Sequence, residues 1–175
     1  MKEAVKKFDE YLKQKNLSFE AIIIGGAALR LMGVISRVTH DVDFLDPEIP
    51  TEIKNASVEF AKLNPDLNLR ASEWINNGPR SLTRDLPIGW RSDLQLIFQG
   101  EAMILHTLGR INLLRTKLYA LADRGTDFQD CVALAPSLSE LEECKDWVLA
   151  GDASELWPGR VRDIYSLLIK ELKLE

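Results

Sequence analysis

Cysteine and histidine are scarce in this chain, which has two of each among 175 residues. Cys131 and Cys144 lie 13 positions apart, and the histidines, His40 and His106, lie elsewhere in the sequence. No combination of these four residues has the spacing of a structural zinc site. We therefore expect both cysteines to be reduced thiols and expect no zinc-stabilised fold.

Long hydrophobic runs are also missing. The longest run covers residues 21–32 and is broken by two glycines and Arg30, whereas a membrane-spanning helix needs about 20 apolar residues. The first eight residues mix acidic side chains and lysines before any apolar stretch, unlike a signal peptide. The sequence therefore predicts a protein of the cytoplasm that does not bind membranes.

What the chain does have is enough apolar side chain for a core. Its residues are 46% hydrophobic and 28% charged, which is typical of one soluble globular domain. The net charge of -5 is unevenly spread, because residues 70–124 carry eight basic and five acidic side chains. Seven of these eight are arginines, which suit bidentate phosphate contacts. This surplus indicates either an anionic partner or a solvated face.

Hydrophobic spacing predicts the order of secondary structure. We expect a helix over residues 3–14, a buried strand over 21–24, a helix over 26–32 ended by Gly33, and a second strand over 42–45. Thr51 is expected to cap a helix that runs to about residue 62. Loops around short strands should fill 64–92, and a hairpin should join 94–98 to 102–105.

Helices dominate the remainder. We expect them to begin after Gly109, at a cap on Thr126, at a cap on Ser137 or Ser139, and at Pro158. The predicted fold class is therefore α+β, with a small mixed sheet flanked by helices. Residues 1–108 would form the α/β core, and residues 109–175 a helical C-terminal lobe of the same domain.

Two short motifs indicate chemistry. Asp41 and Asp43 alternate with Val42, so in a strand both carboxylates point to one face. Nearby carboxylates repel unless a cation lies between them, and Mg²⁺ commonly joins one or two carboxylates to substrate phosphates. Gly25 and Gly26 end an apolar strand and open a helix, where backbone N–H groups bind anions. Together the motifs indicate a site for a metal and a triphosphate.

In these residues the chain resembles the nucleotidyltransferase superfamily that includes DNA polymerase β. It is most similar to the abortive-infection type toxin branch and its minimal bacterial relatives of unassigned function. The matching residues of the first block are Gly25-Gly26, Ala28-Leu29, Gly33, Arg37, Thr39 and 41–44. A looser second block comprises 86–90, 114–121, Arg124 and 127–130.

The resemblance implies a role for each matching residue. Gly25 and Gly26 would cradle phosphates, and Asp41 and Asp43 would hold Mg²⁺. The remaining residues implied at the nucleotide are PLACEHOLDER

The implied reaction moves a nucleoside monophosphate from an NTP to a hydroxyl of RNA, such as tRNA, or of a protein. The resemblance also implies a possible toxin with a cognate antitoxin. Relatives often carry a third carboxylate on a neighbouring strand, for which Asp93 and Glu101 are the candidates in this sequence. A member without that acid could instead bind a nucleotide or a partner without catalysis.

Overall fold

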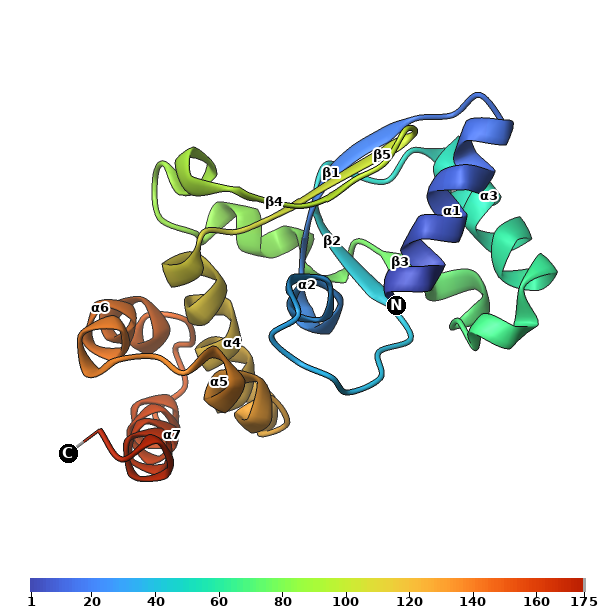
Figure 1. The fold of residues 1–175 in the computed structure, drawn as a ribbon. Coiled ribbons are helices and arrows are strands. Elements are labelled where there is room, and N and C mark those ends of the chain that lie inside the picture. The colour runs from blue at the N-terminus through green and yellow to red at the C-terminus, as the bar shows by residue number, and fades with distance from the viewer. Residues whose placement is uncertain (175) are drawn as a thin grey trace. The chain divides into compact units, whose positions relative to one another are not determined.

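A computed structural model describes residues 1–174. The strands are β1 (Phe19–Ile24), β2 (Val42–Asp46), β3 (Ile75–Asn76), β4 (Gln95–Gln99) and β5 (Met103–Thr107). The helices are α1 (Lys2–Gln14), α2 (Gly25–Met32), α3 (Thr51–Leu63), α4 (Arg110–Arg124), α5 (Phe128–Leu134), α6 (Leu138–Leu149) and α7 (Trp157–Leu172), as labelled in Figure 1. Short 3-10 helices lie at Pro65–Leu67, Ala71–Glu73, Gly78–Arg84 and Trp90–Asp93.

The strands form one mixed sheet in the order β3-β2-β1-β5-β4. Strand β1 is central, because it pairs antiparallel with β2 and parallel with β5. The chain divides into two compact units, one covering Met1–Leu108 with the whole sheet and a second, helical unit that begins at Gly109. The predicted α+β class, with a mixed sheet flanked by helices and a helical C-terminal portion, is confirmed.

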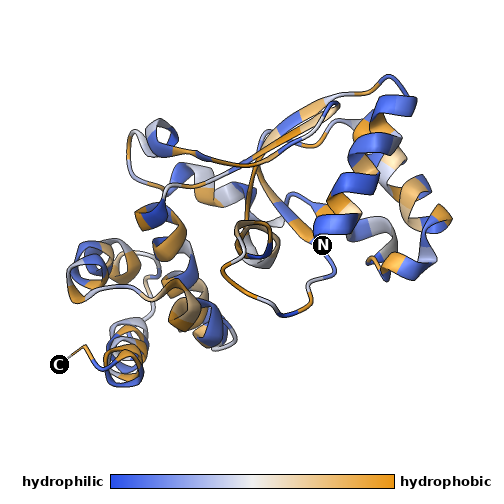
Figure 2. Ribbon diagram, in the orientation of Figure 1, coloured by the Kyte–Doolittle hydropathy of each residue, from blue (hydrophilic) through white to orange (hydrophobic). Residues whose placement is uncertain are grey.

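Alternation along the strands separates a core face from a polar face in the first unit. Figure 2 shows β1 mainly in hydrophobic colours and α1 in both, as expected for a buried strand and an amphipathic helix. Every second strand residue joins side chains of α1 and α3 in one core, including Ala21, Ile23, Val42, Phe44, Met103 and Leu105. The residues between them, Asp43 among these, therefore point away from that core.

A buried carboxylate fixes α1 to the hairpin of β4 and β5. Asp9 accepts hydrogen bonds from the backbone N–H groups of Glu101, Ala102 and Met103 at 3.1, 2.9 and 2.6 Å. These groups lie at the hairpin end, and an unpaired N–H buried there would cost free energy. Gly100 makes the contact possible, because a Cβ at that position would overlap the Asp9 carboxylate.

Helix starts differ from the sequence expectations at two places. Thr51 is the first residue of α3 and Pro50 is its N-cap, so the prediction of a Thr51 cap was wrong by one residue. Similarly Asp127, and not Thr126, is the N-cap of α5. In both cases the neighbouring residue has the non-helical backbone angles, which side-chain type alone did not reveal. Ser137 caps α6 as predicted, in a reciprocal capping box with Glu140.

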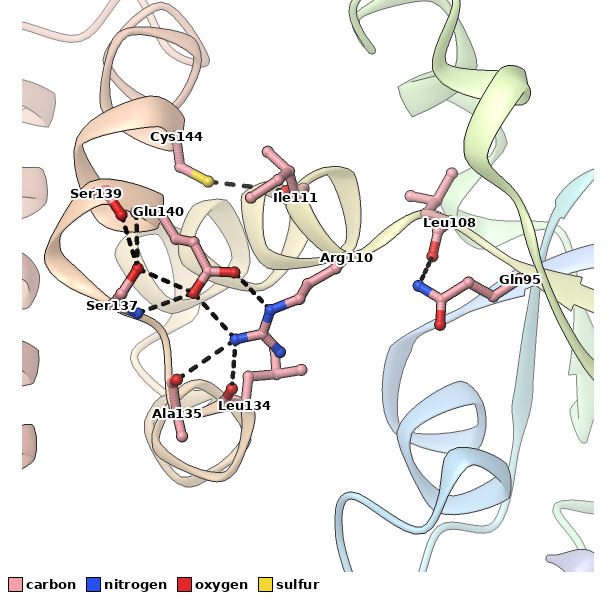
Figure 3. A network of polar contacts seen from close by, with 10 residues as sticks. All are labelled: Gln95, Leu108, Arg110, Ile111, Leu134, Ala135, Ser137, Ser139, Glu140 and Cys144. Atoms are coloured by element: carbon pink, nitrogen blue, oxygen red, sulfur yellow. Dashed lines mark hydrogen bonds and ion pairs between the residues drawn. The ribbon is translucent and has the colours of Figure 1, made fainter.

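Arg110 ties three parts of the helical unit together. Its guanidinium donates to Glu140 and to the backbone carbonyl of Leu134 at 3.0 Å, as Figure 3 shows. The hydrogen bond from Arg110, together with that from the Ser137 backbone, lowers the pKa of Glu140 to about 2. The start of α4 is thereby joined to the end of α5 and to the first turn of α6.

Among the described residues, no helix is both long enough and apolar enough to span a lipid bilayer.

The Asp9 contact predicts that Gly100→Ala destabilises the first unit by about 1–3 kcal/mol, the usual cost of overpacking. Thermal unfolding followed by circular dichroism should show a lower midpoint. Gly159→Ala is the matched control, because nothing lies within 4 Å of a Cβ there and alanine favours the helix. Equal midpoints for Gly100→Ala and the wild type would contradict the role given to Gly100.

The Glu140 network predicts a pH dependence. Glu140 has an ordinary pKa of 4.5 and a folded pKa of about 2, so its contribution to stability is complete above pH 4.5 and is lost as the pH falls toward 2. Glu140→Gln should therefore be less stable at pH 7 and lose less stability across that range. Urea unfolding at several pH values measures this, with Glu142→Gln as the control, since Glu142 contacts only Lys145 at the exposed surface. Parallel pH curves for wild type and Glu140→Gln would refute it.

Candidate active site

The turn between β1 and α2 exposes backbone N–H groups. Gly25 has a φ of +77°, a backbone conformation that side chains rarely allow, and it starts α2 directly after the extended Ile24. No side chain caps this helix start. The first N–H groups of α2 therefore lie at the positive end of the helix dipole, an arrangement that favours anions.

Asp43 lies against this turn. In the pairing of β1 with β2, Asp43 is opposite Ile24, the residue before Gly25. A Cβ at position 25 would be only 2.6 Å from Oδ2 of Asp43. A glycine at position 25 is thus required both by the backbone angle and by the carboxylate beside it.

The segment after α2 returns to the same turn. Gly33 ends the helix in a left-handed conformation, and Arg30 donates to the backbone carbonyls of Ile35 and Ser36. As a result Arg37 and Thr39 lie over Gly26, where a Cβ would be 3.0 Å from Nη2 of Arg37 and 3.4 Å from Oγ1 of Thr39. The glycine pair therefore has a carboxylate on one side and a guanidinium on the other.

Asp41 is the second acid of the site. It lies just before β2, half-buried, and accepts from Thr39 Oγ1 at 3.3 Å and from Arg70 Nη1 at 3.3 Å. Both contacts are long, and the Arg70 side chain is 65% exposed. An exposed ion pair of this kind contributes little stability, so Asp41 can exchange partners readily.

Asn76 is a site residue that sequence reasoning missed. It lies on β3 opposite Asp43, and its Nδ2 donates to Oδ1 of Asp43 at 3.1 Å. Nothing in the sequence around residues 75–76 indicates a strand of only two residues beside β2. Only the folded register reveals the contact.

Neither expected third carboxylate lies beside the pair. Glu101 is at the tip of the hairpin and pairs with Lys13, whereas Asp43 is at the opposite end of β1, about 17 Å away along the strand. Asp93 is exposed and precedes β4, which is separated from β2 by two strands, about 14 Å. Among the described residues, no group of three or more histidine, cysteine or acidic side chains could hold a metal.

The donor set still fits one hard cation. Two carboxylates share one face of the sheet edge, and the absent side chain of Gly25 leaves the space beside Asp43 free of carbon. Oxygen ligands of this kind suit Mg²⁺, which takes few protein ligands and completes its shell with water and phosphate. A cleft of about 440 Å³ adjoins Asp41 and is lined by residues 37–41 and 68–70.

Lys117, Asp130 and Arg124 form a separate cluster in the helical unit. Lys117 Nζ lies 2.8 Å from Asp127 Oδ1 and 2.6 Å from Asp130 Oδ2, with all three side chains buried. Burial alone would raise the pKa of Asp127, but the hydrogen bond and charge of Lys117, with Arg124 at 3.0 Å, hold it below the usual value. The ammonium group already has two carboxylate partners.

Most of the arginines in the middle of the chain are also paired with acids of the protein. The pairs are Arg70 with Asp41, Arg80 with Glu48, Arg91 with Asp46, Arg110 with Glu140, Arg115 with Glu143 and Arg124 with Asp127. The local surplus of positive charge is thus distributed over many ion pairs. This favours the solvated-face interpretation over one extended patch for an anionic partner.

The cysteines carry no nucleophilic chemistry. Both are free and buried, and burial raises the pKa of Cys131 and of Cys144 to about 12. Neither is a thiolate at neutral pH.

Comparison with known proteins identifies a family for most of the chain. The model of a family described as "Nucleotidyltransferase of unknown function (DUF6036)" matches residues 1–138. The matched range contains the whole sheet, the glycine turn, the two acids and the helices α4 and α5. No match was found among curated proteins or among solved structures.

The buried cluster predicts that Lys117→Met destabilises the protein. The change keeps the length of the side chain but leaves two buried carboxylates without their cation, which costs about 3–5 kcal/mol. Urea unfolding measured by circular dichroism should show the loss. Lys145→Met, which removes an exposed lysine from the same unit, should unfold as the wild type does. A Lys117→Met protein of unchanged stability would rule out a structural role for this cluster.

Proposed function

Because the chain belongs to a family of nucleotidyltransferases of unknown function, we propose that the glycine turn and the acid pair form a Mg²⁺-dependent nucleotidyl-transfer site. The substrate is an NTP, and the acceptor is a hydroxyl group. The observation that carries this proposal is the approach of Asp43 to the backbone of Gly25, which brings a cation ligand next to an anion-binding helix start.

Each residue of the first unit has a task in this reaction. The turn at Gly25 and Gly26 binds phosphate oxygens through its N–H groups. Arg37, beside Gly26, offsets triphosphate charge, and Thr39 orients Asp41 through the 3.3 Å hydrogen bond. Asp41 and Asp43 would hold the divalent cation.

The transfer itself is an in-line displacement. The acceptor oxygen forms a bond to the α-phosphorus, the bond from the α-phosphorus to the bridging oxygen breaks, and pyrophosphate leaves with the electron pair. The hydroxyl proton passes to water. A bound divalent cation would stabilise the negative charge that develops on the phosphate oxygens.

The acceptor class is an RNA or protein hydroxyl, as the resemblance implies. A toxin role, with a cognate antitoxin, belongs to the same proposal and would appear as growth arrest on expression that depends on the acid pair. We place the protein in the cytoplasm.

A second candidate function is nucleotide or partner binding without catalysis. One observation favours it: the residue of β3 next to Asp43 is an amide, Asn76, and not a third acid. A protein of this kind would bind Mg²⁺ and NTP saturably and release no pyrophosphate.

The test uses purified protein with each α-labelled NTP, Mg²⁺, and total RNA or total protein. We expect label transfer and pyrophosphate release, both reduced at least about 100-fold in Asp41→Asn and Asp43→Asn because the cation loses a ligand. Asp46→Asn is the matched control, because Asp46 is on the same strand but pairs with Arg91 outside the site.

Equal transfer by the wild type and the Asp43→Asn variant would contradict the proposal. Saturable NTP binding with no pyrophosphate from any NTP would instead support the non-catalytic function.

A further inference from the structure

We propose that Asn76 is a positioning residue that orients Asp43 and limits the site to two carboxylates, so that this chain supplies ligands for one divalent cation and not two. The inference deepens the proposed function and rests on it in one respect, namely that Asp43 is a cation ligand.

Strand β3 places Asn76 at the position nearest Asp43. The two strands run parallel, with Val42 opposite Ile75 and Asp43 opposite Asn76. Neighbouring strands are about 4.8 Å apart, and side chains at paired positions share a face. Val42 and Ile75 are both buried, whereas Asp43 and Asn76 are both partly exposed on the other face. An acid at position 76 would therefore be the third carboxylate of the site.

The orientation of the Asn76 amide is set on both sides. Its Oδ1 accepts from the Gly78 backbone N–H at 2.8 Å, so its Nδ2 must point the other way, toward Oδ1 of Asp43 at 3.1 Å. Rotating the amide by half a turn would break the bond to Gly78 and bring two oxygens together. A Cβ at Gly78 would lie 2.9 Å from Asn76 Oδ1, so glycine also leaves room for this orientation.

This orientation opposes a second cation. The amide presents N–H groups to the site, and these carry partial positive charge and have no lone pair for a metal. Oδ1 of Asp43 is already engaged by the amide, whereas Oδ2 lies against the open space at Gly25. The available carboxylate oxygens suffice for one Mg²⁺ with water and phosphate. A two-metal site needs further anionic ligands between ions about 3.5–4 Å apart.

The direct experiment converts the amide to the missing acid. In Asn76→Asp a third carboxylate replaces the N–H donor, so the acids repel one another without a cation and bind one more strongly with it. Binding of Mn²⁺ is measured without nucleotide, from the electron paramagnetic resonance signal of the free ion. We expect one Mn²⁺ per chain in the wild type and at least about tenfold tighter binding, or a second ion, in Asn76→Asp.

Thermal stability gives a second readout that needs no activity. Asn76→Asp should unfold at a lower temperature than the wild type in EDTA and regain that difference in Mn²⁺. Asn77→Asp is the matched control, because the Asn77 amide donates to the backbone carbonyls of Phe44 and Pro47 and not to an acid. Its loss of stability should be the same with and without the ion.

The proposal is overturned if the wild type already binds two Mn²⁺ ions per chain, a count that does not depend on any variant. It is also overturned if Asn76→Asp binds Mn²⁺ no more tightly than the wild type or is not stabilised by it more than Asn77→Asp is. Failure of nucleotidyl transfer leaves these measurements unchanged, because none of them includes an NTP. Loss of Mn²⁺ binding in Asp43→Asn, in contrast, tests the ligand role on which both proposals rest.

Discussion

Asp43 approaches the backbone of Gly25 so closely that no side chain fits between them. The approach follows from the antiparallel register of β1 and β2, which sets Asp43 opposite Ile24 at the very end of the central strand. Moving the register by one residue would turn Asp43 into the core and Phe44 toward the turn. The buried face of the sheet thus holds the polar face in place, since the apolar residues on either side of Asp43 fix where its carboxylate points.

The two acidic clusters of the chain show how environment assigns different tasks to the same residue types. In the helical unit Asp127 and Asp130 are almost fully buried and hold Lys117 at 2.6–2.8 Å, so removing any member leaves an uncompensated charge. At the glycine turn Asp41 is partly exposed and held only by contacts of 3.3 Å. Chemistry requires groups that can change partners, and stability requires groups that cannot.

The sequence predicted the parts of this structure that depend on neighbours along the chain. Strand β1, the glycine turn, helix α2 ended by Gly33, and the alternation around Val42 are all local patterns, and the structure has each of them. Asn76 and Arg70 were missed because they reach the acids across about 30 residues of irregular chain, where neither periodicity nor spacing carries information. The search for a third acid looked to Asp93 and Glu101 because sequence cannot reveal which strands are neighbours.

The position of β1 between β2 and β5 also governs how the first unit can fold. The pair β1·β2 closes after about 20 residues, whereas the parallel pairing of Phe19 with Met103 must bring together residues more than 80 positions apart. Contacts of such high sequence separation slow folding, because the entropy of closing the loop is lost before the strand contacts form. During synthesis one edge of β1 therefore stays unpaired until the hairpin of β4 and β5 has left the ribosome. The carboxylate of Asp9, waiting in α1 for the N–H groups of that hairpin, is among the last contacts of the unit to form.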